Sequence, residues 1–364
     1  MKKLVIVLSI LLTAIPSLAL SQQTISDNEK DIAIQRIKEI IDSNYVFAEK
    51  AGQVNDALDE ADKSGKFDEI TDYGEFGKAL TAELVRITKD KHFLVNYNPE
   101  LIKSRRAQRE RASRESESSS APSAPETPQV ERIDWNEWYA QQNNMGFPKV
   151  EVLDGNIGYI KINFFQPLDW VRPIIDASMG FVTNTDALII DLTENQGGYR
   201  PTDSYLGSFF FDGEPQLWMS SFNRPTGETE SEFTFAEVGG ARYLNKPLFI
   251  LVSENSFSLA EKFAYSMKHF DKATIVGQVS AGAAHAINFL EVDDNFTFQV
   301  PTLRNIHPVT KTDWEAVGVK PDQVTEKNEA FKRAYLSALD GLIEAARHER
   351  QVKKYNEIKA KLGQ

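Results

Sequence analysis

The stretch that decides the fold is residues 247–285, which read PLFILVSENSFSLAEKFAYSMKHFDKATIVGQVSAGAAH. It opens with an apolar run, Leu248 to Val252, of strand length and with β-branched members. After a polar turn, apolar residues recur at helical spacing and predict a helix that begins near Ser258. Residues 273–276 predict a second buried strand. Ser258 is therefore expected at the junction between a strand and a helix.

Two roles are open to Ser258 at such a junction. A hydroxyl beside free backbone N–H groups and the positive end of a helix dipole has what acyl transfer needs, a nucleophile next to oxyanion donors. Ser258 and Glu261 also match a capping box, which is a structural role. On these residues alone the capping role is favoured, because helix-capping serines far outnumber catalytic ones.

Three segments, in the same order along the chain, resemble the C-terminal processing (tail-specific) serine peptidase family. Residues 255–285 resemble its S-x-S-x-x-E helix, followed by a strand ending in V-G and a small-residue turn. Residues 191–198 (DLTENQGG) resemble its D-x-R-x-N-x-G-G turn, with Thr193 where Arg is usual. Residues 314–322 (WEAVGVKPD) resemble its E-x-x-G-V-x-P-D segment. The family nucleophile is the second Ser of the first motif, which maps onto Ser258.

The resemblance implies a mixed α/β (α+β) fold with a ClpP/crotonase-like catalytic core and an N-terminal helical bundle. It is similar to the branch that contains the tricorn core and the interphotoreceptor retinoid-binding protein modules. We expect no PDZ domain, because the gap before the core is too short for one. The expected organisation is a signal peptide (1–21), a helical domain (22–98), a largely disordered linker (99–149), the catalytic domain (150–326) and C-terminal helices (327–364).

The resemblance also restricts the catalytic base. The tail-specific branch uses a Ser–Lys dyad whose Lys aligns near Ala283, but residues 280–285 read SAGAAH and exclude a Lys at that position. His92, in the segment DKHFLV, matches the D-G-H-x-x-V-type segment that supplies the base in tricorn-like peptidases. With Glu315 as the third member by motif, the implied triad is Ser258, His92 and Glu315. His285 remains the alternative base.

A glycine turn is expected to complete the site. Gly197 and Gly198 follow a buried strand, and their conformational freedom allows backbone N–H groups to point at a ligand. Given the resemblance, we expect one oxyanion donor from this turn and the other from the N–H of Leu259.

Composition excludes several other functions. The net charge of −12 argues against nucleic acid as a partner, and the absence of Cys excludes disulfides and Cys–zinc sites. The His residues are scattered in sequence and predict no metal site, and no cofactor motif is present. The sequence indicates no oligomeric state.

Residues 1–21 have a basic start, an apolar core and a small-x-small cleavage site, which predict a secretory signal. We therefore expect a periplasmic or extracellular protein with no membrane span after cleavage. The expected activity is hydrolysis of peptide or protein substrates. The alternative is a non-catalytic binder of an apolar, retinoid- or lipid-like ligand on the same scaffold.

Overall fold

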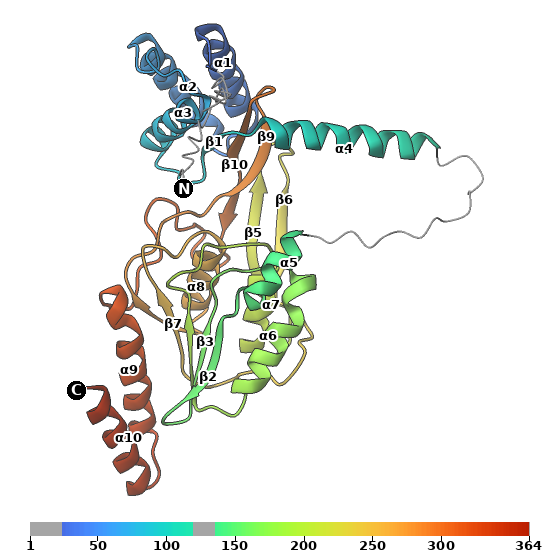
Figure 1. The fold of residues 1–364 in the computed structure, drawn as a ribbon. Helices are drawn as coiled ribbons and strands as arrows, with labels where there is room; N and C mark the ends of the chain where they lie inside the picture. The colour runs from blue at the N-terminus through green and yellow to red at the C-terminus, as the bar shows by residue number, and fades with distance from the viewer. Residues whose placement is uncertain (1–23, 119–134, 364) are drawn as a thin grey trace, which may run out of the picture.

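The computed structural model describes residues 24–118 and 135–363 (Figure 1). The predicted signal peptide therefore lies outside the described residues. Within them, no helix combines the length and the apolar character needed to cross a membrane.

The N-terminal part is the predicted helical bundle. It consists of α1 (Asp27–Asn44), α2 (Ala48–Lys63) and α3 (Tyr73–Thr88). The core of this bundle also includes aromatic residues of strands far along the chain, such as Phe296 and Phe298. The isoleucines of α1 that are buried in it are Ile34, Ile37, Ile40 and Ile41. Ser26 caps α1, because its side chain accepts a hydrogen bond from the N–H of Glu29.

A six-stranded sheet forms the core of the larger part of the chain. Its strand order is β11-β8-β7-β4-β3-β2, and all neighbours are parallel except the β2–β3 hairpin. The strands are β2 (Lys149–Leu153), β3 (Ile157–Lys161), β4 (Ala187–Asp191), β7 (Leu248–Val252), β8 (Thr274–Gly277) and β11 (Gln323–Val324). Every residue of β4 and β7 is buried, as expected for central strands covered on both faces.

Helices cover both faces of this sheet. One face packs against α6, α7 and α8, and the other against α9 and α10 (Figure 1). These helices are α6 (Leu168–Val182), α7 (Thr202–Gly207), α8 (Leu259–His269), α9 (Ala330–Glu344) and α10 (Glu349–Leu362), with 3-10 turns at Ser208–Phe210 and Lys327–Glu329. The mixed α/β class is therefore confirmed.

A second sheet joins the helical bundle to the larger part. Its order is β1-β10-β5-β6, with β9 also paired to β10. The strands are β1 (Leu94–Tyr97), β5 (Leu217–Asn223), β6 (Thr229–Phe233), β9 (Ala286–Glu291) and β10 (Phe296–Ile306). One end of the long β10 pairs with β1 directly after the bundle, and the other end pairs with β5. This strand fixes the segment around His92 against the larger part of the chain.

The segment expected to be a linker is partly helical. It contains α4 (Pro99–Ser118), α5 (Trp135–Gln142) and a 3-10 turn at Asn144–Gly146. At the start of α4, Ile102 is buried, and Arg106 pairs with Glu291 on β9 at 3.0 Å. These anchors stabilise a helix whose composition alone predicted little order. The domain limits given above stay a prediction.

Candidate active site

Ser258 lies at the junction between β7 and α8, where the sequence predicts it. The turn before it is held against the loop after β4, because the Ser256 hydroxyl donates to the carbonyl of Leu192 at 2.7 Å and the N–H of Phe257 donates to the carbonyl of Asn195 at 3.0 Å. Ser258 itself has φ 53° and ψ −113°. A positive φ is costly for a residue with a side chain and persists where the surroundings impose it, often at active sites.

Glu261 links this junction to the turn at 280–283. Its buried carboxylate accepts from the backbone N–H of Ser258 at 2.9 Å, so the Glu261 half of the predicted capping box is present. The same carboxylate accepts from the Ser280 hydroxyl and the Gly282 N–H, both at 2.6 Å, and from the Ala283 N–H at 2.9 Å. Burial raises the pKa of Glu261, although these donors act in the opposite direction. Glu261 therefore holds two loops of the site in one arrangement.

The glycine turn lies directly against Ser258. A Cβ built on Gly197 would be 3.0 Å from the Ser258 Cβ and 3.1 Å from the Leu259 nitrogen. Gly197 has φ +96° and Gly198 has φ +143°, and a Cβ on Gly198 would clash with the carbonyl of Phe165 at 1.9 Å. A side chain would be strained at either position, and at Gly198 the clash with the backbone excludes one.

The backbone N–H groups in and beside this turn differ in whether they already have a hydrogen-bond acceptor. The N–H of Gly197 donates to the side-chain oxygen of Asn195 at 2.8 Å and is therefore occupied. Within the described residues, the N–H groups of Gly198 and Leu259 donate to no other protein group. These two N–H groups are the available donors beside Ser258.

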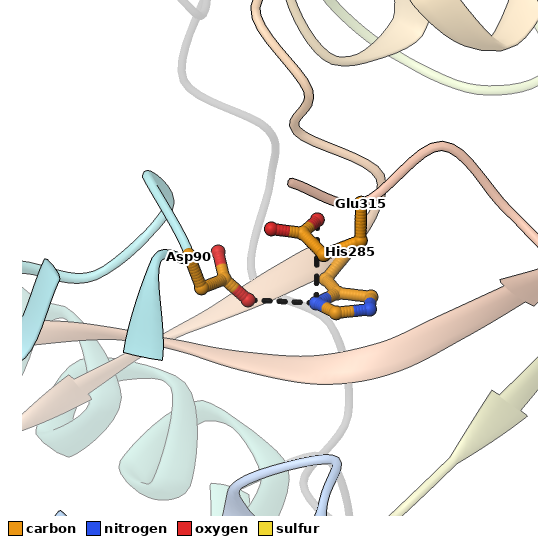
Figure 2. Close-up of side chains that lie close together, drawn as sticks. All are labelled: Asp90, His285 and Glu315. Atoms are coloured by element: carbon orange, nitrogen blue, oxygen red, sulfur yellow. Dashed lines mark hydrogen bonds and ion pairs between the residues drawn. The ribbon is translucent and has the colours of Figure 1, made fainter. Parts of the chain in front are cut away.

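Two buried imidazoles, His92 and His285, flank the carboxylate of Asp90. The Asp90 Oδ2 lies 2.6 Å from His285 Nδ1, and its Oδ1 lies 3.5 Å from His92 Nδ1 (the first contact is drawn in Figure 2). Neither ring nitrogen of His92, nor Nε2 of His285, has a hydrogen-bond partner among the described residues. The His92 ring packs against Phe257, with ring centroids 4.9 Å apart, whereas the His285 ring packs against Phe47 at 5.1 Å.

Glu315 lies beside His285, not beside His92. Its Oε2 is 3.4 Å from His285 Nδ1 and accepts from the N–H of Ala284 at 2.6 Å (Figure 2). Among the described residues, Asp90 is the only one with a carboxylate oxygen within 4.0 Å of His92. The triad implied by the motifs is therefore not assembled through Glu315 in this conformation.

The charges of this cluster are strongly coupled. Burial, together with the nearby negative charge of Asp90, raises the pKa of Glu315 to about 8. Burial also opposes the charge of Asp90, but the hydrogen bond to His285 and the nearby imidazole of His92 hold the pKa of Asp90 well below its usual range. Burial lowers the pKa of His285, and the bond to Asp90 and the neighbouring carboxylates raise it further than burial lowers it. Asp90 is thus the charged carboxylate, whereas Glu315 holds a proton more readily.

The predicted site residues thus fall into two groups. Ser258, Leu259 and the two glycines form one compact junction, and the imidazoles with Asp90 and Glu315 form the second. Asp90 was not identified as a site residue, although it stands two positions before His92 in the matched segment. One ligand atom each from Asp90, His285 and Glu315 lie within 4.8 Å of one another, so these side chains could also hold a cation.

A serine at a strained strand-to-helix turn, with glycine N–H groups against it and buried imidazole–carboxylate pairs nearby, has the groups that acyl transfer by a serine nucleophile requires. The chain belongs to peptidase family S41. The model of that family matches residues 156–325, and the model of the N-terminal domain of peptidase S41 in eukaryotic IRBP matches residues 25–133.

Individual relatives agree with this family. The chain is 27% identical over 176 residues to the chloroplastic carboxyl-terminal-processing peptidase 2 of Arabidopsis thaliana, a match that covers 47% of this chain and 32% of that protein. It is 23% identical over 190 residues to the carboxy-terminal processing protease CtpA of Bacillus subtilis. That match covers 52% of this chain and 39% of that protein. The chain thus spans well under half the length of these relatives.

Among solved structures, the fold is similar to that of a Parabacteroides merdae protein described as a peptidase. The TM-score is 0.54 at 16% identity, and the match covers 82% of this chain and 90% of the other. At this identity the similarity concerns the fold alone.

Proposed function

We propose that this protein is a serine endopeptidase that cleaves peptide or protein substrates by attack of Ser258 on the scissile carbonyl. The observation that carries the proposal is the backbone of Ser258, held at φ 53° with Gly197 packed against its Cβ. A cap needs no such conformation, since capping residues ordinarily have an extended backbone. A strained strand-to-helix turn is, in contrast, how other hydrolase folds expose a nucleophilic serine.

The tetrahedral intermediate would be stabilised by the N–H groups of Leu259 and Gly198. Leu259 is the first residue of α8, so its N–H has no partner within the helix and lies at the positive end of the helix dipole. Such preorganised donors stabilise negative charge that develops only in the transition state, which is why they increase the rate.

His92 is the proposed general base. Its ring lies against Phe257, the residue before Ser258, and its Nε2 is free to accept the Ser258 proton. We assign the supporting carboxylate to Asp90, whose Oδ1 faces His92 Nδ1. Asp90 would stabilise the imidazolium that forms when His92 takes the proton. Glu315, the carboxylate implied by the motifs, then acts one step away, through His285.

His285 remains the alternative base, because its Nε2 is also free. Its ring faces Phe47 in the helical bundle rather than the residue before Ser258. His92→Ala and His285→Ala variants separate the two. We expect His92→Ala to lose as much turnover as Ser258→Ala, because removing any essential member of one catalytic unit disables the whole unit and the losses do not add. A His92→Ala enzyme that keeps wild-type turnover would refute the assignment.

The nucleophile itself is tested with a fluorophosphonate probe and mass spectrometry. We expect the adduct on Ser258 and no adduct on the Ser258→Ala variant. Ser43→Ala is a matched control, because this hydroxyl lies on the exposed side of α1 and bonds only to the carbonyl of Glu39. Modification of another serine would refute Ser258, and wild type that neither reacts nor cleaves any peptide would favour the apolar-ligand binder.

We further propose that the protein acts in the periplasm or outside the cell. The secretory pattern of residues 1–21 supports this location. Fractionation of cells that express the full chain, with N-terminal sequencing of the mature protein, tests it. An uncleaved chain in the cytoplasm would refute it.

A further inference from the structure

A cavity of about 820 Å³ opens beside the glycine turn. It is enclosed by three parts of the chain: α5 with the 3-10 turn after it, the segment from Asn163 to Trp170, and Tyr199. Its volume is within the range of specific ligand sites and exceeds what one side chain fills.

The backbone connects this cavity to Ser258. Gly197, which packs on the Ser258 Cβ, accepts a hydrogen bond at its carbonyl from the N–H of Phe165 at 2.8 Å. The N–H of Tyr199 in turn donates to the carbonyl of Phe165 at 2.8 Å, so that Phe165 and Gly198 form a bridge. Tyr199, the residue directly after Gly198, therefore lines the cavity and connects it to the glycine turn.

The described part of the wall is uncharged. Among the residues that the structure describes, none that lines the cavity carries a charge, and amide and aromatic side chains predominate. Within the described part of the chain, the side-chain amides of Asn163 and Gln166 make no hydrogen bond and are available to a ligand, whereas the backbone N–H of Asn163 is bonded to the carbonyl of Gly146. The rings of Phe164 and Tyr199 pack edge to face, 6.1 Å apart, and Tyr199 is 55% exposed.

We propose that this cavity is the substrate subsite that binds an uncharged peptide segment with a large aromatic or aliphatic side chain, on one side of the bond cut at Ser258. This inference rests on the proposed peptidase function. Amide side chains can pair with the N–H and C=O groups of an extended peptide, and the rings can pack on its side chains. A charged side chain would be desolvated there without a partner, so the cavity selects against it.

A panel of fluorogenic peptides tests the inference, with Phe, Leu, Gln, Glu or Lys placed in turn at each position flanking the cleaved bond. Wild type is expected to favour Phe and Leu over Glu and Lys. Trp170→Ala and Tyr199→Ala should raise KM for the Phe peptide roughly ten-fold and change kcat little, because a pocket contact acts on binding. Phe181→Ala is the matched control, as this ring lies on the same helix as Trp170 but is 60% exposed and outside the cavity.

A charge change makes the test sharper. Asn163→Asp places a carboxylate in the wall and should shift the preference toward the Lys peptide, which a purely structural role of Asn163 would not do. Unchanged preference in Asn163→Asp, together with unchanged KM in both aromatic variants, would overturn the inference.

Failure of the inference is distinguishable from failure of the proposed function. A small fluorophosphonate reports on Ser258 without filling the cavity, so labelling with unaltered specificity refutes the subsite alone. If wild type cleaves no peptide of the panel, binding of the fluorescent Phe peptide to Ser258→Ala protein, measured by anisotropy, decides. Binding that Trp170→Ala weakens supports the subsite, and binding that it leaves unchanged overturns it.

Discussion

Replacing Gly197 by Ala tests the oxyanion site directly. The added methyl group would lie 3.1 Å from the Leu259 nitrogen, which is hydrogen-bond distance for an oxyanion held by that N–H. It would also lie 3.0 Å from the Ser258 Cβ, closer than side chains normally approach. The methyl group therefore crowds the Leu259 N–H and the Ser258 side chain, the two groups that the proposed oxyanion site depends on.

Two effects of known size contribute. Gly197 has φ +96°, and a left-handed backbone costs a residue with a side chain about 1–2 kcal/mol of stability. Loss of one oxyanion donor lowers kcat about 10²–10³-fold. We therefore expect Gly197→Ala to fold, with modestly reduced stability, and to lose at least that factor in kcat for a peptide substrate.

Gly227→Ala is the control for the backbone effect. Gly227 has φ +74° in the turn between β5 and β6, and a Cβ there has nothing within 4 Å. This variant should show a comparable loss of stability in urea unfolding but wild-type kcat. If Gly197→Ala is folded and keeps kcat within about three-fold of wild type, the donors lie elsewhere and the oxyanion assignment is refuted.

Three further outcomes are expected. Lys262→Met should lower the free energy of unfolding by about 3–5 kcal/mol, because it leaves the fully buried Asp203, 3.2 Å from Lys262 Nζ, without its cation. As a control, Lys78→Met removes the cation of the exposed pair with Glu75 and should cost under about 1 kcal/mol. Burial lowers the pKa of His307 to about 4, below its unfolded value near 6.5, so its contribution is complete above pH 6.5 and is lost as the pH falls toward 4. Between pH 7 and pH 5, the free energy of unfolding should therefore fall by about 2 kcal/mol more in wild type than in a His307→Gln variant, and equal changes in the two proteins would contradict this reasoning. Asp90→Asn should reduce turnover by orders of magnitude with the Ser258 backbone intact, and near-normal turnover would exclude Asp90 as the supporting carboxylate.

Short-range signals were sufficient for much of the fold. The strand β7, the turn after it and α8 follow one another within a few residues, so apolar periodicity located Ser258 at their junction. The hairpins β2–β3, β5–β6 and β9–β10 each pair strands that are neighbours in the sequence and are joined by a short turn. In each case the deciding interactions are local.

Long-range contacts account for what the sequence did not predict. The role of Asp90 depends on a 2.6 Å contact with His285, 195 positions further along the chain. Likewise, Lys91 donates to the carbonyl of Ala281 at 2.6 Å, a contact between the bundle and the turn before His285. Such pairs leave no trace in local periodicity, because they form only when β10 brings the two parts together.

By itself, the sequence determined the strand–turn–helix that carries Ser258, the glycine turn, and the family to which both belong, because each is written in a short run of residues. Only the tertiary structure decided which carboxylate faces which imidazole, since burial and distance depend on the pairing of distant strands. It placed Asp90 between His92 and His285 and turned Glu315 toward His285. The sequence predicted which side chains could take part in the chemistry, but it did not predict which of them come into contact.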